Sequence, residues 1–253
     1  MTSPSFYTRD GFQMFMQVVS QPLLTQAGSA IDCITADYAI LPVELQQKIV
    51  LLTTLPSHQF SASYAGDIPA VPYIIGDLPA FGEAFRALLL LPALWQHASE
   101  VLDTAEVVYH FSNVTNKPPL VGPRLNWHRD FPNGYICPRT SRFVRVLIPL
   151  DGMNQHNGCT QIIRNSHLLT DEDALTSKKP SQLEIKPDTV TDILCDRGDV
   201  VFLHPKSIHG GGQNQSTRHR RVVIIQFGVA GEPLETNNRE SFTEYTYQQM
   251  KDI

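Results

Sequence analysis

Apolar residues in the first hundred positions recur at the three- and four-residue spacing of amphipathic helices. Residues 12–19 follow this spacing, with Phe12, Met16 and Val19 on one face, and Pro22 is expected to end the helix that they form. Prolines at plausible first helical positions predict further helices. These run from Pro42 to about Leu52, from Pro79 to about Leu90, and onward from Pro92.

After residue 105 the pattern changes to short apolar or alternating runs that are separated by turn residues. Asn157-Gly158 predicts a tight hairpin turn. The polar stretch 165–188 is expected to form a long excursion, which is a candidate lid, and a short helix is expected within residues 238–253. The predicted strands cover residues 106–111, 125–130, 143–150, 160–163, 199–204 and 222–227.

Helices followed by many short strands, without alternation of strand and helix, predict a β-sandwich or barrel with helical packing on one side. A jelly roll fits this order, because it closes its edges and leaves an open mouth where ligands can bind. We therefore expect a mainly β jelly roll with flanking N-terminal helices, in a single domain that spans residues 1–253. Residues 1–105 would give mainly helical support, residues 106–230 the jelly-roll core, and residues 231–253 a C-terminal extension.

The composition is that of a globular protein, since 42% of the 253 residues are hydrophobic and 18% are charged. The net charge of −5 argues against broad binding to nucleic acids or anionic membranes. The four cysteines form no C-x-x-C pair, no signal peptide is recognisable, and the apolar stretch 87–94 is too short to span a bilayer. We expect a cytoplasmic protein with reduced thiols that binds neither membranes nor nucleic acids.

Candidate metal ligands are found in two predicted strands. His128 and Asp130 lie two residues apart, and residues i and i+2 of a strand point to the same face. An imidazole and a carboxylate would then project into one cavity, and His209 would join them from a non-neighbouring strand. Two histidines and one carboxylate leave open positions on an octahedral ion, as in non-haem Fe(II) oxygenases. The three residues are predicted to bind Fe(II) and to carry catalysis.

A cationic residue follows this set in the chain. Arg220 begins the predicted strand after His209, and its guanidinium is expected to hold a dicarboxylate cosubstrate. Glycines at positions 210–212 would let the backbone approach a bound ligand closely. The run from Arg218 to Arg221 is short and continues into an apolar strand, which argues against a nucleic-acid patch. The leading hypothesis is an oxygenase that uses Fe(II), 2-oxoglutarate and O2.

Short motifs also occur in a characteristic order along the chain. They are Arg9-Asp10-Gly11-Phe12, Asn116-Lys117-Pro118-Pro119, Trp127-His128-Arg129-Asp130, Asn157-Gly158-Cys159 leading to Asn165-Ser166-His167, residues 198–205 (GDVVFLHP), and residues 208–214 (IHGGGQN). Each motif alone is modest, whereas the ordered set is specific and covers nearly the whole chain. In this set the sequence resembles the phytanoyl-CoA dioxygenase family of Fe(II)/2-oxoglutarate oxygenases.

The resemblance implies a double-stranded β-helix in which the same two histidines and Asp130 bind iron. It further implies that Arg220 holds the distal carboxylate of 2-oxoglutarate and that Asn113 faces this cosubstrate. Hydroxylation of an unactivated C–H bond, with release of succinate and CO2, is expected, because Asp130 is present where related halogenases have a small residue. The chain departs from the family at Gly211, where a hydroxyl residue often lies beside the cosubstrate.

The substrate itself is not encoded in a recognisable motif. Arginines gather in sequence around the expected mouth, among them Arg142, Arg145 and Arg164; several facing the cavity would imply an acidic substrate, whereas the alternative places most of them in solvent. A small polar metabolite, such as an amino acid or a biosynthetic intermediate, is the first expectation, and an acyl-CoA or carrier-bound substrate is the second. The residues predicted to bind the substrate are Arg129, Asn133, Tyr135 and Arg139.

Two other classes of function stay open at this point. The chain could be a non-oxidative jelly-roll protein that binds a ligand or a structural metal, or a hydrolase or isomerase with Zn²⁺ on the same ligands. Arg220 separates these alternatives from an oxygenase, because only a 2-oxoglutarate site requires a buried guanidinium one strand away from the metal. As an oligomeric state we expect a monomer or a homodimer.

Overall fold

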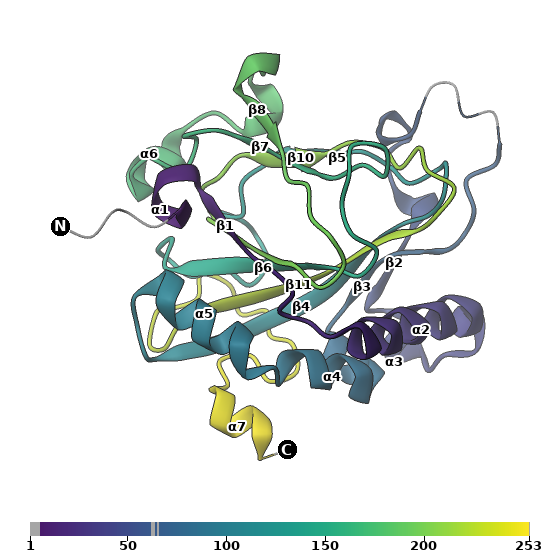
Figure 1. Cartoon of the computed structure of the whole chain (residues 1–253), viewed down its shortest axis with the longest axis horizontal. Coiled ribbons are helices and arrows are strands. Elements are labelled where there is room, and N and C mark those ends of the chain that lie inside the picture. The colour runs from purple at the N-terminus through teal and green to yellow at the C-terminus, as the bar shows by residue number, and fades with distance from the viewer. Residues whose placement is uncertain (1–5, 62–63, 65, 253) are drawn as a thin grey trace.

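Two antiparallel sheets face each other in the computed structural model, which describes residues 6–61, 64 and 66–252. Within these residues, one sheet has seven strands in the order β1-β9-β6-β11-β4-β3-β2, and the other has four in the order β5-β10-β7-β8 (Figure 1). The strands are β1 Phe12–Phe15, β2 Ile49–Leu51, β3 Pro72–Gly76, β4 Val107–Lys117, β5 Leu125–His128, β6 Phe143–Pro149, β7 Thr160–Ile163, β8 Val190–Asp192, β9 Val200–Leu203, β10 His209–Gly211 and β11 Arg220–Val229. This arrangement is the predicted jelly roll.

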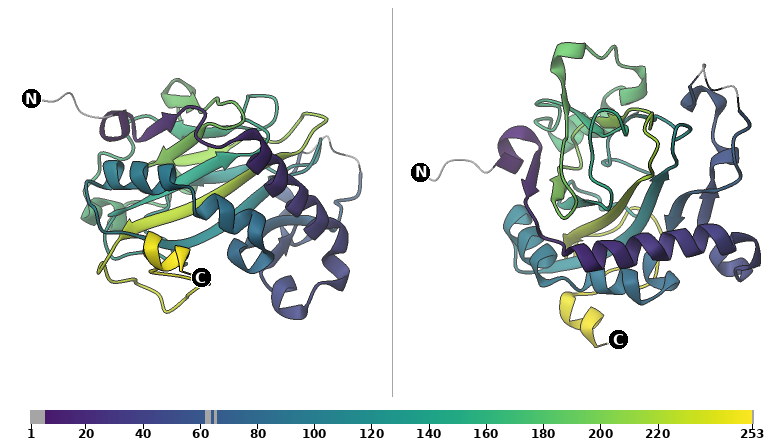
Figure 2. Two further views of the ribbon diagram at one scale, coloured as in Figure 1. Left: turned by 60° about the horizontal axis from the view of Figure 1, so that its bottom comes forward. Right: turned by 45° about the vertical axis from the view of Figure 1, so that its right-hand side comes forward.

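Helices cover one face of the large sheet, while the small sheet lies over the opposite face (Figures 1 and 2). The buried side of α2 carries Leu24, Ile31 and Ile34, which join the main core together with residues of α4 and α5. Trp95 of α5 anchors this layer, because its ring packs against Phe227 of β11 and its indole nitrogen donates to the Leu89 carbonyl at 2.7 Å. The α-helices are α1 Phe6–Asp10, α2 Gln21–Asp37, α3 Val43–Gln46, α4 Glu83–Leu89, α5 Pro92–Leu102, α6 Asp171–Thr176 and α7 Tyr247–Lys251.

The large sheet is apolar on both faces, and its pleat divides the side chains between two compartments. Val223 and Ile225 of β11 face the helices, whereas Val222 and Ile224 face the small sheet. The inward face of the same strand begins with Arg220, two residues before Val222. The alternation of β11 therefore places a cation in the space between the sheets, where ligands bind in this architecture.

Several local predictions were wrong. Residues 12–15 form the strand β1 rather than a helix, because they gain a full antiparallel ladder with β9, from Phe12 opposite Leu203 to Phe15 opposite Val200. Pro22 lies in the first turn of α2 instead of ending a helix. Proline lacks a backbone N–H, and in the first turn this group would have no partner within the helix. The helix expected from Pro42 to Leu52 ends at Gln46.

Tertiary pairing explains the remaining differences. Residues 49–51 leave the expected helix to form β2, which pairs with β3, so the first 105 residues contribute three strands as well as helices. Asn157-Gly158 does form a turn, with Gly158 at a φ of 72°. It is not a hairpin, because β6 and β7 belong to different sheets. The stretch 165–188, expected as a long excursion, carries the short helix α6. In the described parts of the chain, no helix is long and apolar enough to cross a membrane.

Candidate active site

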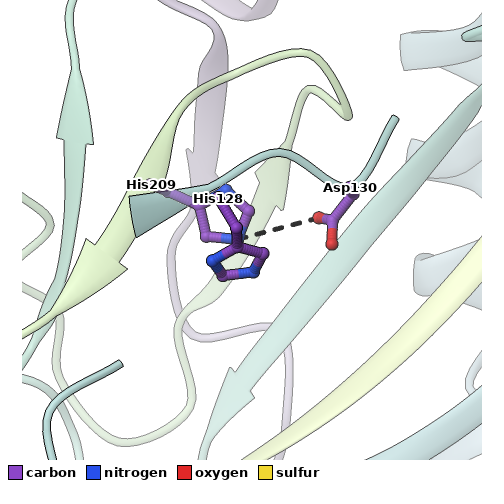
Figure 3. Close-up of side chains that lie close together, drawn as sticks. All are labelled: His128, Asp130 and His209. Carbon is purple, nitrogen blue, oxygen red and sulfur yellow. Dashed lines mark ion pairs between the residues drawn. The ribbon is translucent and has the colours of Figure 1, made fainter. Parts of the chain in front are cut away.

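The three predicted metal ligands come together between the sheets. One ligand atom from each of His128, Asp130 and His209 lies within 4.8 Å of the other two. The two histidines lie directly opposite each other on β5 and β10, with ring centroids 4.1 Å apart. Nε2 of His209 lies 3.8 Å from Oδ2 of Asp130, the contact drawn as a dashed line in Figure 3.

Backbone carbonyls fix the orientation of both imidazoles. Nδ1 of His128 lies 2.9 Å from the Asn126 carbonyl, and Nδ1 of His209 lies 3.0 Å from the Ser207 carbonyl. A carbonyl only accepts, so each Nδ1 carries the proton and each Nε2 keeps its lone pair. Burial lowers the pKa of His209 to about 4, so this ring is neutral near neutral pH. Such a tautomer is the one that a metal-binding histidine requires.

The carboxylate reaches the site from a bend rather than from a strand. β5 ends at His128, and the backbone amides of Asp130 and Phe131 both donate to the Pro205 carbonyl at 2.9 Å. Burial raises the pKa of Asp130, but the electrostatic effect of Arg145 first, and then of the two neighbouring imidazoles, outweighs it and lowers the pKa below its ordinary value. Asp130 is therefore ionised, although only 9% of the residue is exposed.

A cavity of about 320 Å³ extends from the three residues between the sheets. Arg220 lies in its wall and is 4% exposed. Its Nη2 lies 3.3 Å from Oγ1 of Thr160 and 3.7 Å from Sδ of Met153, while its buried Nε has no partner among the described residues. Burial lowers the pKa of Arg220, yet a guanidinium stays protonated in proteins. The cavity thus contains a charged group whose donors are mostly unused.

A threonine hydroxyl lies next to Gly211, the position at which the family often has a hydroxyl residue. Gly211 of β10 lies opposite Thr160 of β7, whose Oγ1 contacts the Arg220 guanidinium. A Cβ at position 211 would lie 3.1 Å from the Cys159 carbonyl and 3.3 Å from Nζ of Lys117, so a side chain there would be crowded. The hydroxyl near the arginine is therefore supplied by the adjacent strand.

The other predicted site residues divide between the cavity and the surface. Asn113, Arg129, Asn133 and Tyr135 line the cavity. Arg139 does not: it is exposed and forms an ion pair with Glu235 at 3.0 Å. Of the sequence cluster of arginines, Arg129 and Arg145 are in the cavity wall, whereas Arg139, Arg142 and Arg164 bind other partners at the surface.

Two residues that contact predicted site residues were not themselves predicted as site residues. Arg145 is inward-facing on β6, and its Nε lies 3.4 Å from Oδ1 of Asp130. Glu240 comes from the C-terminal extension and accepts a hydrogen bond from the Tyr135 hydroxyl at 2.7 Å. Burial raises the pKa of Glu240 to about 7. Arg145 was named only within a cluster of arginines that could face the cavity, and the alternation of β6 is the pattern that could have singled it out.

Comparison with known proteins gives a family. Residues 78–222 match the family model described as phytanoyl-CoA dioxygenase (PhyH). Peroxisomal phytanoyl-CoA dioxygenase of Mus musculus is 24% identical over 165 residues, which are 61% of this chain and 48% of that enzyme. L-proline trans-4-hydroxylase of Streptomyces griseoviridis is 27% identical over 174 residues, 58% of this chain and 63% of that enzyme. The matched stretches therefore span about half to two thirds of these relatives.

The fold is similar to that of solved structures as well. The structure of EctD from S. alaskensis with bound Fe superimposes with a TM-score of 0.69 at 19% identity. The superposition covers 94% of this chain and 80% of that protein. At this identity the likeness establishes the jelly-roll fold, while the side chains described above are this chain's own.

Proposed function

Because the chain belongs to the phytanoyl-CoA dioxygenase family, we propose that it is an Fe(II)- and 2-oxoglutarate-dependent dioxygenase that hydroxylates an unactivated C–H bond of a small polar metabolite. One observation carries the proposal. The cluster of His128, Asp130 and His209 opens into the same cavity as the buried, largely unpaired guanidinium of Arg220. A structural metal site has no use for such a cation.

The donor set fits ferrous iron. Two imidazoles with free Nε2 atoms and one ionised carboxylate supply two nitrogens and one oxygen from one side of the ion. This combination leaves open positions for a cosubstrate and for O2, which is the arrangement of non-haem Fe(II) oxygenases. A structural zinc site would instead surround the ion with four protein ligands, and the described residues bring only these three together.

The opposite part of the cavity fits the distal carboxylate of 2-oxoglutarate. Arg220 would donate to the carboxylate in a charge-assisted, bidentate pair, which would satisfy the orphaned Nε. Thr160 would add a hydroxyl hydrogen bond from β7. Asn113, which lies opposite Ile224 on the neighbouring strand and lines the same cavity, would face the chain of the cosubstrate.

When bound, iron and 2-oxoglutarate supply the oxidising chemistry, in which O2 converts 2-oxoglutarate to succinate and CO2 and one oxygen atom enters the substrate. The protein positions the metal, the cosubstrate and the substrate, and it excludes water from them. The three ligands hold the metal at one end of the cosubstrate, and Arg220 holds the other end. Apolar side chains, among them Leu147, Val222 and Ile224, line the cavity between the two. They keep water from the reacting carbon.

The size of the cavity supports a small substrate. Ligand pockets usually have volumes of about 300–1,000 Å³, and this cavity of about 320 Å³ must also hold the cosubstrate. Arg129, Asn133 and Tyr135 would contact the substrate from the rim. A metabolite of amino-acid size is therefore proposed ahead of an acyl-CoA. That the matched Streptomyces enzyme acts on L-proline is compatible with this size class.

Labelled cosubstrate provides the test of the activity. The protein is supplied with Fe(II), O2 and ¹³C-labelled 2-oxoglutarate, together with fractions of a small-molecule extract, and labelled succinate is measured. We expect succinate to form only with iron and O2 and to increase with the fraction that holds the substrate. Asp130→Ala should remove this signal. A wild-type protein that binds Fe(II) and 2-oxoglutarate but releases no succinate with any fraction would overturn the oxygenase assignment.

A further inference from the structure

Arg145 is a second buried cation whose purpose the metal and the cosubstrate do not explain. It projects from the middle of β6 into the cavity, and only 8% of the residue is exposed. Its guanidinium lies over the ring of Phe111, with Cζ 4.3 Å from the ring centroid. None of the described residues accepts a hydrogen bond from it, and its buried Nε is an orphan. Most donors of this charged group are thus left for a ligand.

Among the described residues, its ion-pair partner is Asp130, one of the proposed iron ligands. Oδ1 of Asp130 lies 3.4 Å from Nε of Arg145, while Oδ2 faces His209. Metal binding engages the negative charge of this carboxylate and leaves the arginine without an ion-pair partner among the described residues. Glu240 acts on Arg145 only from a longer distance, and burial raises its pKa to about 7, so this carboxyl is partly protonated near neutral pH.

Arg145 and Arg220 lie at opposite ends of the site. Arg145 pairs with Gln226 across β6 and β11, six residues along β11 from Arg220. At about 3.3 Å per residue this separates their backbone positions by roughly 20 Å. The iron ligands lie beside the Arg145 end. One molecule of 2-oxoglutarate that reaches from the metal to Arg220 therefore leaves Arg145 free on the substrate side.

Resting on the proposed function, we infer that Arg145 binds a carboxylate of the primary substrate and holds the neighbouring carbons at the metal. Formal charge favours a carboxylate over a phosphate monoester. The charges of Fe(II) and Arg220 cancel those of Asp130 and 2-oxoglutarate, so the cation left over at Arg145 is balanced by a monoanion. A phosphate monoester carries about −1.5 to −2 near pH 7.

This assignment selects the substrate class. The guanidinium lies next to an iron ligand, so the oxidised carbon is close to the carboxylate, as in an amino acid or a small hydroxy acid. Arg145 acts as a specificity residue, and the neutral primary amide of the same compound should be rejected. Stacking on Phe111 holds the planar guanidinium in place, so little conformational entropy is lost on binding.

The test uses matched probes on the anaerobic complex of the protein with Fe(II) and 2-oxoglutarate. Small amino acids and hydroxy acids are each titrated beside their own primary amides, and binding is measured by calorimetry. For at least one pair we expect the carboxylate to bind roughly ten- to a hundredfold more tightly than the amide. Arg145→Gln should bring the two affinities together, and Arg145→Lys should restore part of the preference. Arg139→Gln, which changes an exposed arginine paired with Glu235, is the control and should behave as wild type.

The outcomes separate the two proposals. A wild-type protein that binds no Fe(II) or no 2-oxoglutarate contradicts the proposed function before any probe is added. If the loaded complex forms but every carboxylate fails to bind, or binds no better than its amide, the role of Arg145 is overturned. The role is also overturned if Arg145→Gln keeps the preference, or if it loses Fe(II) affinity alone, since the arginine would then serve only to position Asp130.

Discussion

Replacing Arg220 by methionine should have opposite effects on cosubstrate binding and on the stability of the unliganded protein. Arg220 is a buried charge with an orphaned Nε and one hydrogen bond to Thr160 at 3.3 Å. Without ligand it is costly to bury, so Arg220→Met should leave the free energy of unfolding unchanged or raise it by about 1–4 kcal/mol. Methionine fills much of the same space with an apolar chain.

The loss on the binding side follows from the same geometry. Removing one partner of a buried, hydrogen-bonded charge pair costs about 2–5 kcal/mol. This corresponds to an increase of about 30- to 4,000-fold in the Kd for 2-oxoglutarate. Metal affinity should be retained, because Arg220 contacts none of the three ligand residues in the hydrogen bonds and ion pairs of the described chain.

The neighbouring residue supplies a matched control. Arg221 points to the helical side of the sheet, where it pairs with Asp151 at 2.7 Å and Asp32 at 3.0 Å. Arg221→Met removes the same charge one position away, so it should lower stability and leave the Kd for 2-oxoglutarate unchanged. Calorimetric titration with Mn(II) as metal, together with thermal unfolding of the apoprotein, measures both quantities. Equal 2-oxoglutarate affinity in wild type and Arg220→Met would refute the reasoning.

Four further substitutions test other parts of the molecule. Thr160→Val removes the hydroxyl beside Arg220 at nearly constant volume. The loss of about one hydrogen bond should raise the Kd for 2-oxoglutarate by roughly two- to tenfold. An unchanged Kd in the same titration would show that Thr160 does not contact the cosubstrate. His128→Ala and Asp130→Ala should each abolish stoichiometric Fe(II) binding after anaerobic loading, measured as bound iron, and retention of iron by both would mean that the ligands are wrong. Burial raises the pKa of Glu240 from 4.5 to about 7, so the folded state binds the extra proton between these values and the wild type should lose roughly 1–3 kcal/mol of stability as the pH rises from about 4.5 to 7. Glu240→Gln should lack this loss, and identical pH profiles of denaturant unfolding for the two proteins would contradict it.

The chemistry-bearing residues could be predicted from the sequence because their environments are local. Strand alternation and the breaks at prolines and glycines indicate where β5 and β11 lie and which face carries Arg220, whereas β10 was not among the predicted strands. The bend at Asp130 was not predicted, since the Pro205 carbonyl that accepts from its amide lies 75 residues away in the chain. The sequence predicted that Asp130 lies beside the two histidines, as it does in the structure, but it predicted a strand where the chain bends.

Contacts between segments that are far apart in the sequence could not be predicted. Residues 12–15 carry a helical spacing of apolar side chains, yet the ladder to β9 overrides it. Sequence clustering also misjudged the arginines: Arg139 is near Arg145 in the chain, but one pairs with Glu235 in solvent and the other enters the cavity. The Thr160 hydroxyl lies beside Gly211 only because of the register in which β7 pairs with β10. Each of these depends on long-range pairing.

The most direct measurement of the central claim is an anaerobic titration of the protein with Fe(II) and 2-oxoglutarate, followed by visible absorption. If the triad and Arg220 form one site, a weak metal-to-ligand charge-transfer band should appear only when both are present, at one equivalent of each. Asp130→Ala should give no band, and Arg221→Met should give the wild-type band. A folded wild-type protein that binds the metal but gives no band at any 2-oxoglutarate concentration would contradict the account.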